Sequence, residues 1–437
     1  MVAPGLIVAA PASGQGKTTL TLGLIAAFAH RGERVRSFKV GPDYIDPAFH
    51  EAAGGHPCLN IDGWAMRPET LSTLAGALFA DSTFVIGEGV MGLFDGAADG
   101  SGSTADIAAR FRLPVVLVID ASRQGASIAA LAEGFARHRE DVAVAGVVLN
   151  RVASAAHEAA LRRALSVAQI LVFGAIARDE ALALPSRHLG LVQAREHAAL
   201  KEFVARAAER IERSVDLTAL RSSAACPALK TSHAAFPTTL PPLGQRSAVA
   251  RDDAFAFAYP HILEGWRRAG AELTFFSPLA DEAPRADCDA IFLPGGYPEL
   301  YAARLSQASH FHRDLRDLAA RGAVIYGECG GYMVLGDGLI DEKGARHAMA
   351  GLLPLETSFA ARKLHLGYRA LELIDSNPLG DRGARIRGHE FHYATITREG
   401  AGEPLFQASD ASGSSLGPQG RRAGTVFGSF MHLIDRG

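Results

Sequence analysis

The stretch LIVAAPASGQGKTT, residues 6–19, joins an apolar run of strand length to a glycine-containing loop. The loop continues into LTLGLIAAFAH, residues 20–30, an apolar segment of helical length that ends before Gly32. In the order strand, loop and helix, Gly14 and Gly16 let backbone N–H groups converge on phosphate oxygens, and the helix N-terminus favours an anion. The stretch therefore predicts a phosphate-binding loop after the first strand of a parallel α/β sheet.

The side chains of this loop predict that ATP and Mg²⁺ bind there. Lys17 is placed to reach the terminal phosphates and Thr18 to ligate Mg²⁺, with Thr19 beside them. Pro11 stands where the standard pattern has glycine, so the match is to a variant phosphate loop. The alternative is a glycine-rich turn with a surface lysine.

Two further loops in the first half are rich in acids. GPDYIDP, with Asp43 and Asp46, follows one expected strand, and EGVMGLFDG, with Glu88 and Asp95, follows the next. Parallel sheets bring the carboxyl ends of their strands to one edge, so these acids are expected beside Thr18. Thr18, Asp46 and Glu88 are the expected Mg²⁺ ligands, directly or through water. The alternative is that Asp43 and Asp46 only cap a turn around Pro42 and Pro47, and that Asp95 precedes a glycine in an ordinary loop.

A proline-rich segment, residues 222–245, divides the chain. Its four prolines lie among small and hydroxylated residues without apolar periodicity, which is typical of a linker. On both sides short apolar runs alternate with alanine-rich stretches of helical length, so two α/β domains are expected, residues 1–221 and 246–437. The expected strands are 6–10, 35–40, 84–88, 115–119, 144–149, 170–173, 254–258, 273–276, 290–293 and 323–326.

The second half contains a cysteine between glycines, in GECGGYM, at the end of an expected strand. A tight turn from strand to helix exposes a thiol at the helix N-terminus, which lowers its pKa, so Cys329 is the expected nucleophile. A lone cysteine is otherwise most often a buried core residue. Gly295 and Gly296, in PGGYPE, are the expected oxyanion hole, and His432 is the expected base.

The segment RGHEFHY contains H-E-x-H, which differs from the H-E-x-x-H spacing of zinc sites. In a strand, Glu390 and His392 share one face and His389 points away, so this segment alone does not supply three converging ligands. Substrate contact and a structural role are both open for it, and likewise for His365 and Tyr368.

Composition excludes several classes of protein. The 437 residues are 48% hydrophobic, too apolar for disorder and too long for one compact core. The formal charge of −3 indicates neither a nucleic-acid partner nor an acidic tail, so small-molecule partners are expected. Four widely spaced cysteines without C-x-x-C fit the reducing cytoplasm, and no stretch has the pattern of a signal peptide or membrane span.

The first half resembles the family of cobyrinic and hydrogenobyrinic acid a,c-diamide synthases. The similarity rests on PASGQGKT, on GPDYIDP followed by His50, and on GEGVMGLFDG. It implies a domain like dethiobiotin synthetase, in which ATP phosphorylates a carboxylate of a corrin macrocycle and ammonia displaces the phosphate. The resemblance assigns Lys17 and Thr18 to ATP and metal, and the four acids to the ligase site. It places Asn150 against adenine, whereas the alternative is that Asn150 caps the next helix.

The second half resembles the triad-type class I glutamine amidotransferase domain, in the branch found in corrin amidases. The resemblance implies that Cys329 attacks the glutamine amide and His432 relays the proton. The common pattern has glutamate two residues after the histidine, where this chain has Ile434. Either Cys329 and His432 work as a dyad, or a carboxylate from elsewhere orients the His432 ring. The sequence gives no reason to prefer Asp435 for that role. Tyr332 stands where many relatives have glutamine.

The two resemblances together imply a ligase that uses ATP and glutamine to amidate the a and c acetates of hydrogenobyrinic or cobyrinic acid in cobalamin biosynthesis. A homodimer is compatible with this interpretation. One alternative is an amidase of other corrin carboxylates, like cobyric acid synthase. Another is a P-loop ATPase switch with an inactive amidotransferase-like domain, although such a module would not need the pair Cys329 and His432.

Overall fold

The computed structural model describes residues 2–182, 186–187, 190–228 and 239–437. It divides into two compact units, one of Met1–Trp64 and Leu71–Ala235 and one of Ala65–Thr70 and Phe236–Gly437. The segment expected as a linker begins within helix α8 (Leu217–Ser223), and its residues 229–238 lie outside the described part. Among the described residues, no helix combines the length and the apolar character needed to cross a bilayer.

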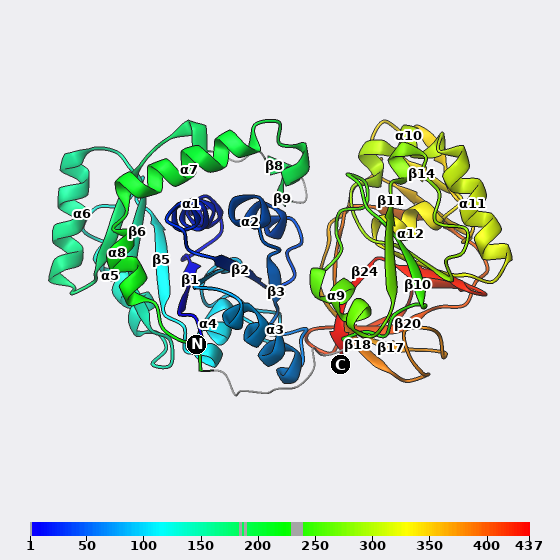
Figure 1. Ribbon diagram of the computed structural model, residues 1–437, viewed down its shortest axis with the longest axis horizontal. Coiled ribbons are helices and arrows are strands. Elements are labelled where there is room, and N and C mark those ends of the chain that lie inside the picture. The colour runs from blue at the N-terminus through cyan, green and yellow to red at the C-terminus, as the bar shows by residue number, and fades with distance from the viewer. Residues whose placement is uncertain (1, 183–185, 188–189, 229–238) are drawn as a thin grey trace. The chain divides into compact units, whose positions relative to one another are not determined.

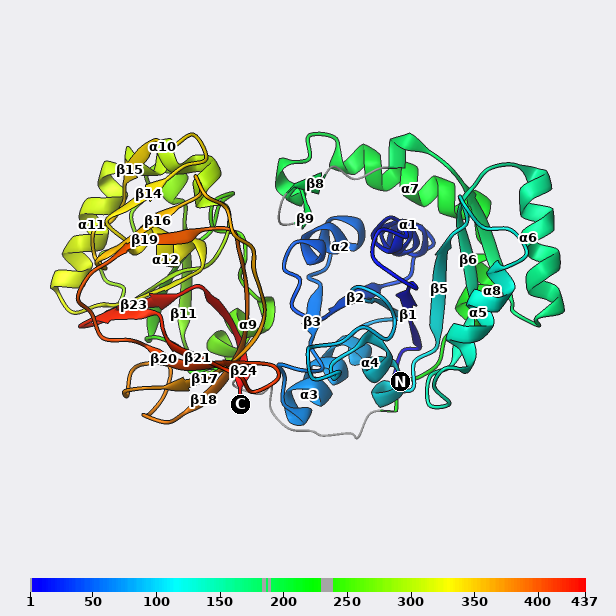
Figure 2. The same ribbon diagram turned by 180° about the vertical axis from the view of Figure 1, so that it is seen from behind.

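The first unit is built on a parallel sheet of seven strands in the order β3-β2-β4-β1-β5-β6-β7. Figures 1 and 2 show β1, β2, β3, β5 and β6 of this sheet among the helices of the unit. Its strands are β1 (Gly5–Ala9), β2 (Val35–Val40), β3 (Leu59–Ile61), β4 (Phe84–Glu88), β5 (Val115–Asp120), β6 (Val144–Val152) and β7 (Val172–Ala177). Its helices, besides α8, are α1 (Lys17–His30), α2 (Asp46–Gly54), α3 (Pro68–Ala80), α4 (Thr104–Phe111), α5 (Ile128–Arg137), α6 (Ala155–Val167) and α7 (Leu200–Ser214). Two short strands, β8 (Ser186–Arg187) and β9 (Gly190–Leu191), pair separately.

Helix α1 is apolar on nearly every side because it lies between the sheet and helix α7. Gly23 makes this close packing possible: a Cβ atom there would lie 2.5 Å from Ile211 Cγ1 and 2.9 Å from the Ala207 carbonyl oxygen. All five residues of β1 are buried, as expected for a central parallel strand covered on both faces. The start of α1 is therefore held firmly against the carboxyl ends of β1 and β4.

The second unit combines a parallel sheet, which has one antiparallel edge strand, with two smaller sheets. The first has the order β11-β10-β12-β13-β23-β22, and the others β15-β14-β16-β19 and β21-β20-β17-β18-β24. The strands of the first are β10 (Arg246–Ala250), β11 (Glu272–Phe276), β12 (Ala290–Leu293), β13 (Val324–Glu328), β22 (Arg421–Ala423) and β23 (Val426–Ser429). The other strands are β14 (Gly338–Ile340), β15 (Arg346–Ala348), β16 (Leu355–Ser358), β17 (His365–Leu373), β18 (Arg385–His392), β19 (Thr395–Glu399), β20 (Phe406–Asp410), β21 (Ser415–Gln419) and β24 (Met431–Arg436). The helices are α9 (Pro260–Arg268), α10 (Ala302–Ser306), α11 (Ser309–Ala320) and α12 (Gly330–Leu335).

The expected fold class, two α/β domains with a parallel sheet in each, is confirmed. Nine of the ten expected strands overlap an observed one, but the strand expected at 254–258 is wrong. Asp252 accepts a hydrogen bond from the Ala254 N–H and makes a turn there, while Phe255 and Phe257 are buried. The strand of this region is β10, just upstream, and the three-residue strand β3 was not expected.

Candidate functional site

The phosphate loop of the first unit has the strand–loop–helix geometry that its sequence predicts. Helix α1 begins at Lys17, and its N-cap Gly16 has a left-handed backbone, with φ of 95°. Gly14, with φ of 78°, is left-handed as well. At Gly16 space adds a second reason for glycine, since a Cβ there would lie 2.2 Å from Asn150 Nδ2.

Lys17 lies inside the loop rather than on the surface. Its Nζ donates to the carbonyl oxygens of Met91, at 2.6 Å, and Ala12, at 3.3 Å. Burial, followed by the charge of Lys39, lowers the pKa of Lys17 to about 8. The alternative of a surface lysine on an ordinary turn is therefore wrong, because Lys17 is buried.

Thr18, Asp46 and Glu88 converge at the carboxyl ends of neighbouring strands. The Thr18 hydroxyl donates to Glu88 Oε1 at 2.6 Å and lies 3.5 Å from Asp46 Oδ2. Lys39, at the end of β2, donates to Asp46 Oδ2 at 2.5 Å and to Glu88 Oε1 at 2.8 Å. Lys39 was not predicted as a site residue, although it lies two residues before the acidic loop. Burial opposes the charge of Lys39, but Asp46 and Glu88 raise its pKa well above the usual range.

The second oxygen of Glu88 belongs to another buried pair. Glu88 Oε2 lies 2.7 Å from His50 Nε2, and His50 Nδ1 lies 3.4 Å from the Cys58 sulfur. Burial opposes ionisation of Glu88, but Lys39 and His50 hold its pKa below the usual range. Burial and the neighbouring Asp43 raise the pKa of Asp46 to about 7. Glu88 is therefore the more firmly ionised of the two acids.

Asp43 and Asp95 lie nearby but serve their own loops. Asp43 Oδ1 accepts the backbone N–H groups of Ile45, at 2.8 Å, and Asp46, at 3.1 Å. Asp95 Oδ2 accepts the N–H of Gly92 at 2.8 Å. The contacts of Asp43 are those of the turn-capping alternative, and the catalytic role of both side chains stays a prediction.

A cavity of about 370 Å³ opens beside the phosphate loop, lined by Gly16, Thr19, Asp120, Asn150 and Arg151 among others. The Asn150 side chain donates to the Gln15 carbonyl oxygen at 2.8 Å, and Arg151 pairs with Asp120. Helix α6 is capped by Ser154. The alternative that Asn150 caps the next helix is therefore wrong.

Cys329 of the second unit stands in a strained turn between β13 and α12. Its φ and ψ are 45° and −104°, an unfavourable region for a residue with a side chain. The expectation of an exposed thiol of low pKa is wrong, because the side chain is buried. Burial, followed by the charge of Glu299, raises the pKa of Cys329 well above its usual range. A nearby base is therefore needed to form the thiolate.

The glycine turn and His432 pack around this cysteine turn. A Cβ on Gly295 would lie 2.2 Å from His432 Cε1, and one on Gly330 would lie 3.0 Å from the Gly296 nitrogen. The geometry brings these expected residues together, beside Cys329. Burial, followed by the charge of His389, lowers the pKa of His432 to about 3, which favours the neutral ring.

One carboxylate close to His432 comes from the residue before the nucleophile. Glu328 Oε2 lies 3.9 Å from His432 Nδ1. Asp435 is engaged elsewhere, since it accepts hydrogen bonds from Arg67 and Thr70 within the same unit. Glu328 was not predicted from the sequence, although it is an acid at the buried end of the strand that leads to Cys329.

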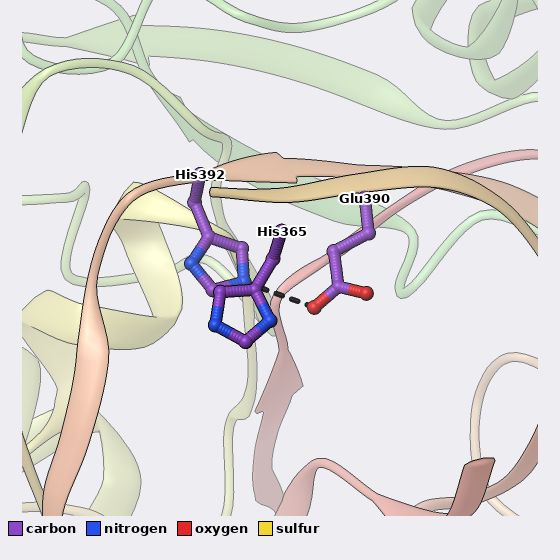
Figure 3. A group of neighbouring side chains, drawn as sticks. All are labelled: His365, Glu390 and His392. Atoms are coloured by element: carbon purple, nitrogen blue, oxygen red, sulfur yellow. Dashed lines mark hydrogen bonds and ion pairs between the residues drawn. The ribbon is translucent and has the colours of Figure 1, made fainter. Parts of the chain in front are cut away.

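The open segment RGHEFHY lies on β18, next to the strand of His432. Glu390 hydrogen bonds to His392 at 2.9 Å, while His389 is the cross-strand partner of His432, so the residues alternate as expected. His365, on β17, completes a group with Glu390 and His392 whose possible ligand atoms lie within 4.8 Å of one another (Figure 3).

This group is arranged as a hydrogen-bonded stack. The rings of His365 and His392 are 4.7 Å apart and nearly parallel, at 5°, so their nitrogen lone pairs lie in separate planes (Figure 3). Phe430 covers the ring of His392 at 3.9 Å, and Arg369 donates to Glu390 at 2.7 Å. Both ring nitrogens of His392 have protein partners, Glu390 and the Ala394 carbonyl.

Comparison with known proteins matches both units to described families. Residues 246–436 match the CobB/CobQ-like glutamine amidotransferase domain, and residues 6–192 match the CobQ/CobB/MinD/ParA nucleotide binding domain. The chain is 56% identical to hydrogenobyrinate a,c-diamide synthase of Brucella anthropi, over 99% of this chain and 98% of the relative. It is 52% identical to the protein of that name from Rhodobacter capsulatus, over 98% of each. Among solved structures, the cell division ATPase MinD of Pyrococcus furiosus matches at 17% identity and a TM-score of 0.29, covering 49% of this chain and 99% of that one.

Proposed function

Because the chain belongs to the family of hydrogenobyrinate a,c-diamide synthases, we propose that it amidates the a and c acetate side chains of hydrogenobyrinic acid in cobalamin biosynthesis. ATP activates each carboxylate and glutamine supplies the nitrogen. The observation that carries this proposal is the presence, in one chain, of a nucleotide-type phosphate loop and a cysteine–histidine–glycine site, with full-length relatives of that name.

In the first unit, the ATP phosphates would lie on the loop at the N-terminus of α1. Lys17 donates hydrogen bonds to two loop carbonyl oxygens, and its ammonium group would neutralise the negative charge that develops as the phosphoryl group is transferred. The cavity beside Thr19 and Asn150 has the volume of a small-ligand pocket and would take the nucleoside. A carboxylate of the macrocycle would attack the terminal phosphorus, ADP would leave, and ammonia would then displace phosphate from the acyl phosphate.

The oxygen donors in this site fit Mg²⁺. Thr18, Asp46 and Glu88 present only oxygen atoms toward one point, which is the ligand type that this ion prefers. Bound there with the nucleotide, Mg²⁺ would neutralise phosphate charge. Lys39 forms ion pairs with both carboxylates, and this protein cation holds the two acids in place.

In the second unit, His432 would take the proton of the Cys329 thiol, and the thiolate would attack the side-chain carbonyl carbon of glutamine. The backbone at Gly295 and Gly296 would stabilise the oxyanion. The imidazolium then protonates the leaving nitrogen, the C–N bond breaks and ammonia departs. Water hydrolyses the thioester to glutamate, with His432 again acting as base.

The test measures glutamate release and pigment mass with glutamine, ATP, Mg²⁺ and hydrogenobyrinic acid, for the wild type and Cys329→Ala. The expected result is Cys329-dependent glutamate release and two successive exchanges of a carboxyl hydroxyl for an amino group. ATP turnover without amide, or glutamate release that Cys329→Ala leaves unchanged, would contradict the proposal. A preference for cobyrinic acid would move the substrate to the cobalt-containing macrocycle.

Further parts of the proposal concern the state of the protein in the cell. We expect a cytoplasmic homodimer without nucleic-acid or membrane partners. Cell fractionation and light scattering of the purified protein test these expectations.

A further inference from the structure

Glu328 is a buried acid that the glutaminase chemistry above leaves without a role. It is the last residue of β13 and directly precedes Cys329. Its Oε1 accepts the Tyr326 hydroxyl at 3.0 Å and the Leu433 N–H at 3.2 Å. These two bonds fix the carboxyl group and turn its other oxygen, Oε2, toward Nδ1 of His432, 3.9 Å away.

The second acid near His432 in the sequence is engaged by other residues. Asp435 follows His432 by three residues on β24, and the pairing of β24 with β18 is irregular between the two, so the partners of Asp435 rather than its spacing show where its carboxylate lies. Its oxygens bind the Arg67 backbone and guanidinium and the Thr70 hydroxyl, at 2.6–3.2 Å. Asp435 therefore has partners of its own, whereas Glu328 has an oxygen directed at the imidazole.

We propose that Glu328 is the positioning residue for His432, in place of the glutamate that related amidotransferases carry where this chain has Ile434. The inference rests on the proposed roles of Cys329 and His432. A hydrogen bond from His432 Nδ1–H to Glu328 Oε2 leaves the lone pair on Nε2, which then accepts the proton of the Cys329 thiol. The S–H bond breaks, an N–H bond forms, and the resulting imidazolium lies beside the Glu328 carboxylate.

The distance of 3.9 Å is longer than a hydrogen bond, so the proposal requires the imidazole and the carboxyl group to approach each other by about 1 Å. Catalytic hydrogen bonds are commonly long in ligand-free structures and tighten when substrate binds. The pairing of β13 with β23 places Glu328 opposite Ser429, three residues before His432. The carboxyl group thus reaches the histidine from a neighbouring strand, rather than from its own.

The charges around the pair give the proposal a pH signature. Glu328 faces Tyr326, Cys329 and His432, and the strand β18 presents its own ionisable groups, His389, Glu390 and His392, to His432. Burial raises the pKa of Glu328 to about 8, although the Leu433 N–H and the Tyr326 hydroxyl act in the opposite direction. Glutaminase turnover should therefore rise as the pH increases through about 8, where the Glu328 carboxylate forms.

The test compares Glu328→Gln and the control Asp435→Asn with the wild type, in the full-length enzyme. Glutamine keeps the length and the oxygen that accepts from Tyr326, but it lacks the charge beside His432. For Glu328→Gln, kcat with glutamine should fall on the order of 100-fold, the scale of a misplaced acid–base group, while KM for glutamine stays nearly unchanged. The rise near pH 8 should disappear. Amidation with ammonium chloride bypasses Cys329 and should be retained, and Asp435→Asn should keep glutaminase turnover.

The outcomes separate this proposal from the function it rests on. A Glu328→Gln enzyme with wild-type kcat and pH profile overturns the positioning role, and so does loss of turnover in Asp435→Asn alone. A wild type that makes amide from neither glutamine nor ammonium overturns the proposed function as well.

Tyr326→Phe provides a test that leaves Glu328 in place, should Glu328→Gln lose the ammonium-dependent activity through misfolding. Removing the hydroxyl that stabilises the carboxylate should shift the rise in glutaminase activity to higher pH. An unshifted profile in Tyr326→Phe would overturn the proposal.

Discussion

Buried charge around the phosphate loop is balanced by single side chains. Lys39 is 3% exposed and bridges Asp46 and Glu88, which are themselves buried. Removing one member of such a group leaves the others charged and desolvated, which costs more than the pair itself contributes. The individual residue therefore decides whether this part of the site can fold.

Lys39→Met should destabilise the protein by about 3–5 kcal/mol, because two buried carboxylates lose their cation. Urea unfolding at pH 7, followed by circular dichroism, measures the change. Lys343→Met is the matched control, since Lys343 is exposed, and its effect should lie within about 0.5 kcal/mol of zero. Equal stability of the two variants would show that Lys39 does not balance the acids.

His50 should give the stability of the first unit a pH dependence of defined sign. Burial lowers its pKa, but Cys58 and Glu88 raise it to about 10, above the ordinary value of 6.5. A raised histidine pKa contributes stability that is complete below pH 6.5 and is lost as the pH rises through 10. Lys17, whose pKa is lowered to about 8, acts with the opposite sign over a similar range.

Comparing the wild type with His50→Gln isolates the histidine, because Lys17 is common to both. Urea unfolding at pH 6.5, 8 and 10 should show the two proteins approaching each other in stability as the pH rises. A difference that stays constant across these three values would contradict a charged His50 in the folded protein.

The site residues that lie in loops at the carboxyl ends of parallel strands could be predicted from the sequence. The buried charged residues that contact them through packing could not. Thr18, Asp46 and Glu88 were predictable because carboxyl ends of parallel strands meet at one edge. Lys39 and Glu328 occupy buried ends of strands, and nothing in the local pattern reveals which partner an inward-facing charge will find. Only the three-dimensional pairing of strands supplies that information.

At the scale of elements, the packing of α1 on α7 holds the phosphate loop against the sheet. The helices approach closely because Gly23 has no side chain, and its position faces Ala207 and Ile211. Gly76, in α3, has open space instead, since a Cβ there would meet nothing within 4 Å among the described residues packed around the helix. The two glycines therefore differ in packing, but both lose the same extra backbone entropy when the helix forms.

Gly23→Ala should destabilise the protein by about 1–3 kcal/mol, since the added methyl group overpacks the contact with α7. Gly76→Ala, the matched control, should stabilise it by about 0.5–1 kcal/mol, because alanine loses less backbone entropy in a helix. Thermal and urea unfolding of the two variants check both signs. Stabilisation by both substitutions would show that α1 and α7 are less tightly packed than the distances indicate.

Strands were predictable from the sequence where burial on both faces makes a continuous apolar run, as in β1, β4 and β12. The alternating residues 254–258 mimic a strand, but Asp252 binds the Ala254 N–H and diverts the chain into a turn. Strand β3 is only three residues long, too short for a periodic signal. Its place at the sheet edge depends on pairing with β2, and a contact between separate segments of the chain leaves no mark in the local sequence pattern.

On the scale of the whole molecule, the two proposed sites lie in two compact units. One unit holds the nucleotide-type loop and the other holds the cysteine turn, and the contacts described above for each site join residues of one unit. In the proposed function, ammonia is the chemical link between them. A substitution in the cysteine site should therefore lower amide formation from glutamine alone, whereas a substitution in the nucleotide site should lower amide formation from both glutamine and ammonium.

Lys17→Ala should lower amide formation from glutamine and from ammonium alike, by about 10²–10³-fold, because both routes need the activated carboxylate. Cys329→Ala should abolish the glutamine route and leave the ammonium route at wild-type rates. Lys201→Ala, at an exposed position of α7, controls for removal of a positive charge. Mass analysis of the pigment, with each nitrogen source supplied separately, measures all three variants. Loss of the ammonium route in Cys329→Ala would show that the cysteine also serves the ligase chemistry, and the division of labour between the units would be wrong.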